Sequence, residues 1–456
     1  MFYSELMATQ ARLMTTGSIR KHLIFFAVPI FLGGLLQQLY QTTDAVVVGN
    51  FVSTQALAAI SSVGSLTMLI VGLFQGIFVG AGVIISTAFG EGDKIAVSKA
   101  VHTTVALGII SSILLTIIGY FSTPTILMWM KTPPEVFVDA QAYIRIFFLG
   151  ISSLVFYNTA SGILQAVGDS KNPLYFLIVA ATLNIVLDLV FVIVFGMGIE
   201  GTAYATIISQ SVSAILSFRL LFRTKEVIRV RIKDIRIYRR FLGRTLTLGI
   251  PSGIQNSVTS FANVIVQSSI NLFGPAAMAA HGSYNRIQGF AFIPITAFAL
   301  ALTTFTGQNL GAGQKQRVKE GARFGIIFAM ILAQAVGFTL IVFGRPAMTI
   351  FSRDSEIIRL GIQKGLIAGP FFWALALSHT MTGIFRGAGK SIVPMTVMLS
   401  IWCVLRIIFI KVGLSLFFDI RVVFWAHPLT WAISAVIFLF YYFLVDWMKT
   451  NDERNL

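Results

Sequence analysis

The sequence is poor in the groups from which most enzyme sites are built. Cys403 is the only cysteine, so the chain can form no internal disulfide and offers no paired-thiol redox motif or cysteine-rich metal site. Charged residues make up only 11% of the chain, and Asp and Glu number 18 against 34 Lys and Arg. There is no metal-ligand pair, nucleophile beside a base or nucleotide-binding loop in the pattern, and these absences argue against an enzyme.

What the sequence has instead is hydrophobic length. Of its 456 residues, 56% are hydrophobic, and the mean hydropathy is +0.83. These values are typical of a polytopic membrane protein rather than of a soluble core. Apolar stretches of ~20 or more residues, each able to cross about 30 Å of hydrocarbon as a helix, recur along the chain. Twelve spans are predicted, at 22–49, 57–89, 100–122, 138–166, 173–196, 200–222, 242–272, 278–309, 321–344, 360–385, 392–417 and 422–447.

The fold class follows from the need to pair every backbone N–H and C=O group within the hydrocarbon of the membrane. An open sheet would leave unpaired N–H and C=O groups in hydrocarbon, and the apolar runs are too long for the strands of a barrel. The chain is therefore predicted to be an all-α integral membrane protein with twelve transmembrane helices. The first span is too long for the hydrophobic region of a signal peptide, so we expect it to remain in the mature protein.

The net charge of +16 comes from Lys and Arg residues in alternate loops. Because they do not form one continuous basic face, a nucleic-acid partner is not expected. The positive-inside rule places these loops and both termini in the cytoplasm, and we expect a single chain in the inner (plasma) membrane, in contact with lipid. The basic segment 219–244 is interpreted as a cytoplasmic linker that fixes orientation. Attachment of this linker to anionic lipid headgroups is the alternative interpretation.

The two halves of the chain repeat each other. Pro29 and Pro251 stand 222 positions apart, each early in a span. Two turns recur at an offset of 221, in the segment pairs 90–94 with 311–315 and 162–173 with 383–394. Six helices per copy is an even number, so both copies enter the membrane from the same side, as in parallel-repeat transporters. Two six-helix lobes with a central cavity between them are predicted, at 1–218 and 245–456.

Carboxylates are almost absent from the predicted spans. Only Asp44 and Asp188 lie deep inside apolar segments, both in the predicted outer half of the membrane. An acid in hydrocarbon costs several kcal/mol, and such residues usually face a polar cavity and take part in ion or proton pathways. The two acids therefore indicate a transporter.

Polar residues at helical spacing accompany both acids. Asn184 lies one turn before Asp188 on the fifth span, and Thr206 offers a hydroxyl on the neighbouring sixth span. Residues three and four apart share a helix face, so each acid belongs to a polar stripe. The stripe on the first span consists of Gln37, Tyr40, Gln41 and Asp44.

This pattern resembles the multidrug and toxic compound extrusion (MATE) family, and within it the DinF-like branch. The likeness covers almost the whole chain and rests on the twelve-span plan, the Asp44 helix with Pro29 fifteen residues earlier, and the Asn184-x-x-x-Asp188 helix. It implies a V-shaped pair of six-helix lobes that export cationic, amphipathic compounds in exchange for H⁺ or Na⁺. It also implies a cation site at Asp44, Asn184, Asp188 and Thr206, with Pro29 as the hinge of the first helix.

One departure from the family concerns the second lobe. The family's other branch is known for acidic cation-site residues there, whereas the seventh span of this chain carries Gln255 and no acid, and the tenth span has none. The repeat offsets place Val266 and Phe409 opposite Asp44 and Asp188. Cation coupling is therefore predicted in the N-terminal lobe.

Two coupling schemes are compatible with the sequence, and neither needs a cofactor beyond H⁺ or Na⁺. In the first, Asp44 or Asp188 takes up a proton and the first span bends at Pro29, where the helix lacks a donor. In the second, the two carboxylates ligate Na⁺ together with the Asn184 and Thr206 oxygens.

Substrate class is less constrained than ion coupling. The cavity is predicted to be lined from two spans, with packing between helices an equal alternative for the second. Its residues are Gln37, Tyr40 and Gln41 on the first span and Asn256, Thr259 and Asn263 on the seventh. A different function is a flippase or exporter of a lipid-linked or anionic amphipathic metabolite, because Arg406 falls roughly mid-span and suits a phosphate group.

Overall fold

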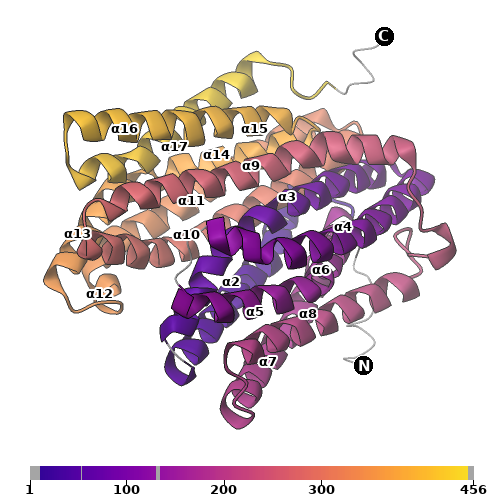
Figure 1. Ribbon diagram of the computed structural model, residues 1–456. Coiled ribbons are helices and arrows are strands. Elements are labelled where there is room, and N and C mark those ends of the chain that lie inside the picture. Colours follow the sequence, from indigo (N-terminus) through magenta and orange to yellow (C-terminus); the bar gives the residue numbers. More distant parts are fainter. Residues whose placement is uncertain (1–10, 53, 130–133, 450–456) are drawn as a thin grey trace. The chain divides into compact units, whose positions relative to one another are not determined.

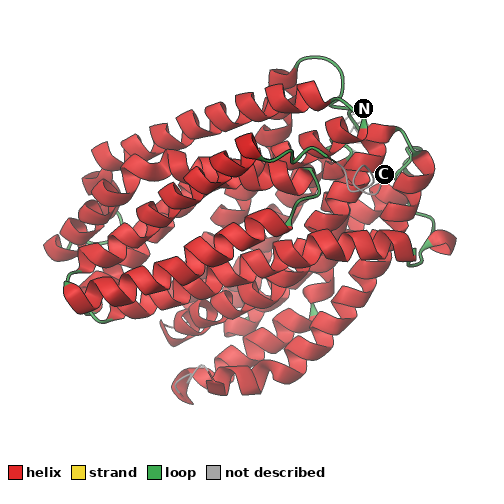
Figure 2. Cartoon of the chain, turned by 90° about the horizontal axis from the view of Figure 1, so that it is seen from above, coloured by secondary structure: helices red, strands yellow, loops and turns green. Residues whose placement is uncertain are grey.

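The computed structural model describes residues 11–52, 54–129 and 134–449, and within these it leaves undescribed the side chains at 41, 45–46, 49–50, 54–70, 129 and 134–136. Every regular element in the described part is a helix, and no strand occurs there (Figure 2). The predicted all-α fold class is confirmed.

The helices are labelled in Figure 1. Those before the linker are α2 (Ile19–Phe51), α3 (Thr54–Glu91), α4 (Lys94–Trp129), α5 (Pro134–Leu149), α6 (Ile151–Ala166), α7 (Lys171–Leu189), a π-helical turn at Val190–Val194 and α8 (Gly198–Arg223). The linker holds one 3₁₀ turn at Ile232–Asp234. The helices after it are α9 (Arg239–Asn271), α10 (Pro275–Gly311), α11 (Lys315–Val342), α12 (Gly344–Thr349), α13 (Ser355–Ala368), a 3₁₀ turn at Gly369–Phe371, α14 (Phe372–Gly387), α15 (Ile392–Val397), a π-helical segment at Met398–Leu405, α16 (Arg406–Leu416) and α17 (Ile420–Leu444).

The number of helices able to cross a membrane differs from the predicted twelve. Among the described residues, ten are long and apolar enough, or eleven if α5 and α6, bent by 45° at Gly150, form one span. The predicted seventh span corresponds to α9, which is 33 residues long but is too polar to meet the same standard. α9 is more polar than the other long helices because its face after Pro251 carries serine, threonine, asparagine and glutamine at helical spacing.

The paired turns have the same backbone structure in both halves. In each, the N–H after a glycine donates to a carbonyl five residues earlier, as in a Schellman helix end. The glycines have φ between 71° and 87°, a left-handed conformation that costs a residue with a Cβ about 1 kcal/mol or more. The four glycines are Gly92 and Gly313, Gly168 and Gly389, and the four bonds start from Asp93, Gln314, Asp169 and Lys390.

The chain divides into two compact units. The first comprises Met1–Leu13 and Val28–Gly249, and the second comprises Met14–Ala27 and Ile250–Leu456. Both boundaries within helices fall two residues or fewer before a proline, Pro29 in α2 and Pro251 in α9. The predicted lobes at 1–218 and 245–456 stay predictions. The units differ from these lobes because the start of α2 belongs to the second unit and the start of α9 belongs to the first.

The start of each of these helices packs closely within its unit. In the first unit, a Cβ added at Gly80 of α3 would lie 2.6 Å from the backbone nitrogen of Gly249, so only glycine permits this helix crossing. In the second unit, the Met14 N–H donates to Gln308 Oε1 at 2.9 Å, and Leu23 is fully buried. Each unit therefore contains a helix start that continues into the other.

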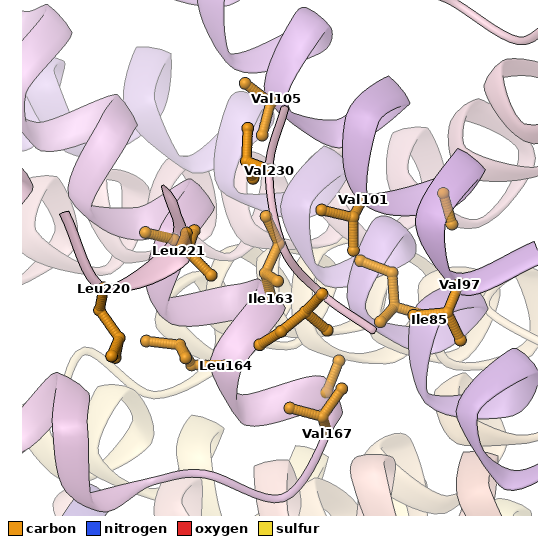
Figure 3. Close-up of a cluster of buried hydrophobic side chains, with 14 of the residues drawn as sticks. Ile85, Val97, Val101, Val105, Ile163, Leu164, Val167, Leu220, Leu221 and Val230 are labelled. Carbon is orange, nitrogen blue, oxygen red and sulfur yellow. The ribbon is translucent and has the colours of Figure 1, made fainter. Parts of the chain in front are cut away.

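A buried aliphatic cluster holds together the end of the first unit that carries the linker. It joins α3, α4, α6 and α8 to linker residue Val230 (Figure 3). Two bonds fix the linker to α4: Arg231 N–H donates to His102 Nε2 at 3.0 Å, and Tyr238 N–H donates to Thr103 Oγ1 at 3.3 Å. The linker thus has a packing role in addition to the topogenic role predicted for it.

Candidate cation site

Helices α2 and α7 run side by side in the first unit, and this alignment positions the two acids. A Cβ added at Gly33 would lie 3.5 Å from Leu177 of α7, and further along the same two helices Asp44 meets Asp188. Asp44 follows Gly33 by eleven residues and Asp188 follows Leu177 by eleven, which is about 16 Å along each helix. The helices are therefore parallel and in register at these two levels.

The carboxyl groups of Asp44 and Asp188 lie close enough to hydrogen bond to each other. Such a bond requires one proton, because an ionised carboxylate has acceptors only. Asp188 is 0% exposed, and both its oxygens, with Asp44 Oδ1, have no protein hydrogen-bond partner among the described residues. Two adjacent buried carboxylates repel each other strongly, so this arrangement is suited to a shared proton or to a cation between the oxygens.

Helix α8 lies antiparallel to α7 and brings a second layer of polar groups to the same level. The two helices pack together around a turn between Gly196 and Gly198, both with positive φ. Asp188 precedes Gly196 by eight residues and Thr206 follows Gly198 by eight. By the same count, Asn184 and Gln210 are each twelve residues from the turn and lie level with each other.

These neighbours also have polar atoms that the protein does not satisfy. Asn184 is 1% exposed, and neither its Oδ1 nor its Nδ2 has a partner among the described residues. The same holds for Thr206 Oγ1 and Gln210 Oε1. Buried polar groups are normally hydrogen bonded, so a run of unpaired oxygens beside two carboxyl groups indicates a site built for a cation or for protonated water. We did not predict Gln210 from the sequence, although it lies one turn after Thr206.

Tyrosines border the carboxyl pair, and the sequence pattern did not single out two of them. Tyr143 of α5 lies close enough to interact electrostatically with Asp44, Asp188 and Tyr40. Tyr157 of α6 lies near Tyr40, and its hydroxyl donates to the carbonyl of Pro173 at 3.0 Å. The only sequence signal for either residue is a phenol within an apolar span, which is common in membrane helices.

The residues predicted to line a substrate cavity lie on one helix of each unit and differ in their exposure. In the first unit Tyr40 is buried and Gln37 is exposed, whereas the side chain of Gln41 lies outside the described residues. In the second unit Asn256 and Thr259 are half-buried and Asn263 is exposed. The Thr259 hydroxyl donates to its own helix at the carbonyl of Gln255. The lining role of these residues stays a prediction.

Pro29 lies inside α2, which remains helical on both sides of it. Proline has no N–H, so the carbonyl four residues earlier, that of Phe25, loses its helical donor at this point. The unit boundary falls between Ala27 and Val28, within the same turn. Pro29 therefore stands where a bend of α2 would separate the two parts of the helix, and its hinge role stays a prediction.

The described part of the second unit contains no counterpart of the carboxyl pair. Gln255 is buried and accepts a hydrogen bond from Arg386 Nη2 at 2.6 Å through its Oε1. No group of three or more His, Cys, Asp or Glu suitable for a metal ion occurs in the part of the chain that the structure describes. The predicted location of cation coupling in the N-terminal half is consistent with this distribution of acids.

The long apolar helices and the buried pair of acids define a multi-pass membrane transporter. The MatE family model matches the chain twice, at residues 29–190 and 251–412. The two matches cover more than half of the chain, are offset by 222 positions and begin at the two helix prolines, so they bear out the internal repeat. The chain belongs to the MatE family, whose members are membrane transporters rather than enzymes.

Known proteins resemble the chain over most of its length. The probable multidrug resistance protein YpnP of Bacillus subtilis (strain 168) is 29% identical over 423 residues, which cover 89% of this chain and 94% of that protein. An FAD transporter of Shewanella oneidensis is 25% identical over 311 residues, or 67% of this chain and 68% of that protein. A solved outward-facing structure of a multidrug resistance MATE family transporter of the MOP superfamily has a TM-score of 0.89 at 24% identity, covering 95% of this chain and 97% of that one, and supports the fold.

Proposed function

We propose that this protein is a secondary antiporter that exports cationic, amphipathic drugs or toxic compounds in exchange for H⁺ or Na⁺. The observation that carries the proposal is the contact between the carboxyl groups of Asp44 and Asp188. Asp188 is fully buried, and both its oxygens, with Asp44 Oδ1, are buried without a hydrogen-bond partner among the described residues. Relatives named multidrug resistance proteins support the export of drugs. We place the protein in the inner (plasma) membrane with both termini cytoplasmic, and in the DinF-like branch of its family.

In the proposed cycle, ion binding and substrate binding compete at the first unit. A proton or Na⁺ that enters from outside neutralises the carboxyl pair and removes its attraction for a cationic substrate. Neutralisation also lets α2 bend at Pro29, because the helix already lacks one backbone bond there. A ligand shifts the balance of two conformations only by its differential affinity for them, and here the ion and the drug favour different conformations.

The donor set fits either ion. Four carboxylate oxygens, the Asn184 amide oxygen and the Thr206 hydroxyl are hard oxygen ligands of the kind that alkali and alkaline-earth cations prefer. A proton needs only the Asp44 and Asp188 oxygens, since one hydrogen bond between them leaves a single shared negative charge.

The test is transport by the purified protein in proteoliposomes, with a pH gradient or a sodium gradient imposed alone. We expect accumulation of a cationic dye such as rhodamine 6G with at least one gradient. Asp188→Asn should abolish this accumulation, whereas Glu200→Gln, which removes an exposed acid from the first turn of α8, should not. Accumulation that is unchanged when both Asp44 and Asp188 are replaced by asparagine would refute the proposal.

A second candidate function is the export of an anionic amphipathic metabolite. The observation that favours it is the resemblance to an FAD transporter, a protein named for a phosphate-bearing substrate. Uptake of FAD into the same proteoliposomes, driven by the same gradients, distinguishes this function from the first.

A further inference from the structure

The second unit encloses a group of cationic side chains that the proposed coupling does not use. Lys364 of α13 is 3% exposed. Its Nζ donates to Asn285 Oδ1 of α10 at 2.6 Å and lies 3.0 Å from His281 Nδ1 on the same helix. It also lies 4.9 Å from the centre of the Tyr284 ring. Among the described residues, the contacts of this ammonium group are thus with neutral groups or with another nitrogen base.

Arg406 at the start of α16 is buried in the same way. It is 1% exposed, and its Nε and Nη2 both donate to one hydroxyl, Thr430 Oγ1, at 3.3 and 2.9 Å. Its guanidinium lies 5.5 Å from the Trp402 ring centre. A guanidinium has five N–H donors, so a single hydroxyl leaves most of its hydrogen-bonding capacity unused.

The two cations belong to one cluster. His427 of α17 lies close enough to interact electrostatically with Arg406, Lys364 and His281. The helices that carry them pack in a chain of contacts, α10 on α13, α13 on α17, and α17 on α16. Each side chain of the cluster lies six to ten residues from the end of its helix on the predicted outer side, or about 9–15 Å along the helix. The four side chains are His281, Lys364, Arg406 and His427. They are therefore at a common depth.

No acid in the described part of this unit neutralises the cluster. The described part of the unit contains five acidic residues, all at or near helix ends: Glu320, Asp354, Glu356, Asp419 and Asp446. None interacts with Lys364, Arg406 or His427. An arginine cannot lose its proton in a protein, and a buried charge without a counter-charge is strongly unfavourable. The cluster therefore calls for an anion from outside the unit.

The internal repeat relates positions in this cluster to positions near the carboxyl pair of the first unit. At the offset of 222 positions between the two family matches, Arg406 corresponds to Asn184, one turn before Asp188. Lys364 corresponds to Ala142, the residue before Tyr143. Positions of the second unit that are equivalent to neutral neighbours of the carboxyl pair and of Tyr143 thus carry basic side chains.

We propose that Lys364 and Arg406, with His281 and His427 beside them, form an anion-binding site that takes the carboxylate, sulfonate or phosphate group of an amphipathic aromatic compound. The Trp402 and Tyr284 rings against the cations supply a surface for the aromatic part. The site goes beyond the proposed cation-coupled export, and its binding function does not depend on that export. The same anionic group is present on free compounds and on acidic lipid headgroups.

The test is equilibrium binding of two fluorescent dyes with the same xanthene ring and opposite charge. Carboxyfluorescein and rhodamine 6G are titrated against the full-length protein in phosphatidylcholine nanodiscs, with fluorescence anisotropy as the readout. Arg406→Gln and Lys364→Gln should each weaken carboxyfluorescein binding about tenfold or more, because each removes a charged hydrogen-bond donor. Rhodamine 6G binding by the same variants should stay within a factor of two to three, which also shows that they are folded.

Matched controls remove a cation from the same helices without touching the cluster. Lys411→Gln on α16 and Arg359→Gln on α13 replace exposed residues and should leave carboxyfluorescein binding unchanged, and Arg406→Lys should restore part of it. Nanodiscs that contain phosphatidylglycerol identify the source of the anion. Weakened dye binding there means that lipid headgroups occupy the site, and unchanged binding means that free compounds do. Failure of the wild-type protein to bind carboxyfluorescein in phosphatidylcholine, or equal binding by Arg406→Gln and Lys364→Gln, would overturn the proposal. Neither result would bear on rhodamine transport through Asp188.

Discussion

The two units share a backbone plan and differ in the charge that they bury. The first places Asp44 against Asp188, and the second places Lys364 and Arg406 beside His427. The turns with left-handed glycines occur at equivalent positions in both. A repeat of this kind retains the glycines and prolines that set helix ends, while the polar residues on the helix faces diverge. The chain therefore has two chemically opposite interiors in one framework.

The largest effect on transport should come from removing a carboxylate of the pair in the first unit. Asp188→Asn keeps the shape of the side chain but can neither share a proton with Asp44 nor bind Na⁺ as a carboxylate. We expect gradient-driven accumulation of rhodamine 6G in proteoliposomes to fall to the level of protein-free vesicles. Arg406→Gln should leave this accumulation largely intact, and equal losses in the two variants would remove the distinction between the units.

The paired turns offer a second comparison, in stability. Gly168 and Gly389 both have positive φ, so alanine costs about 1 kcal/mol at either position from backbone strain. At Gly168 an added Cβ would also overlap the Arg12 carbonyl oxygen, whereas nothing lies within 4 Å at Gly389. We expect Gly168→Ala to lower the thermal unfolding temperature in detergent more than Gly389→Ala. Equal shifts would mean that the N-terminal segment does not pack on this turn.

Stability also distinguishes a binding role for Arg406 from a structural one. Replacing a buried ion pair by apolar residues of similar volume is often neutral or stabilising, by about 1–4 kcal/mol, and a buried guanidinium without a counter-charge loses no ion pair on replacement. Arg406→Met should therefore unfold at the same or a higher temperature than the wild type in the absence of an anionic ligand. A marked fall in unfolding temperature would instead assign the guanidinium a structural role through its bonds to Thr430.

The smallest effect concerns a surface cap of the second unit. Asp419 accepts from the Arg421 backbone N–H at 2.8 Å and pairs with its guanidinium at 2.6 Å, so hydrogen bonds from Arg421 lower the pKa of Asp419. A lowered pKa means that its contribution is present above the ordinary Asp pKa of about 3.9 and is lost as the pH falls below it. Asp419→Ala should cost about 1 kcal/mol or less at pH 7. The difference from wild type in thermal unfolding should shrink below about pH 4.

The sequence predicted much of the framework because membrane helices have few alternatives. Apolar length located the spans, and the spacing of glycines and prolines located the repeat and its turns. Intramembrane acids are so rare that Asp44 and Asp188 stood out without any structural information. Among the described residues, the test of length and composition finds ten or eleven spans rather than twelve, because α9 combines the length of a span with a polar face.

The remainder depends on contacts that no local pattern encodes. Tyr143 reaches the carboxyl pair only because α5 packs within the same unit, and its position in the sequence resembles that of any buried phenol. Lys364 lies nine residues into α13, where a lysine is usually taken to extend toward the membrane surface. Its burial against α10 and α17 depends on the packing of helices that are far apart in the chain.

The bond between Met14 and Gln308 has a consequence for biosynthesis. Its partners are separated by 294 residues, and Arg317 also donates to the Met14 carbonyl. While the ribosome is still extending the chain, Met14 lacks these partners until α10 and α11 have been made. These bonds at the amino-terminal end can therefore form only after about two thirds of the chain has been synthesised. Truncated products that end at the linker would lack Gln308 and Arg317, to which Met14 bonds.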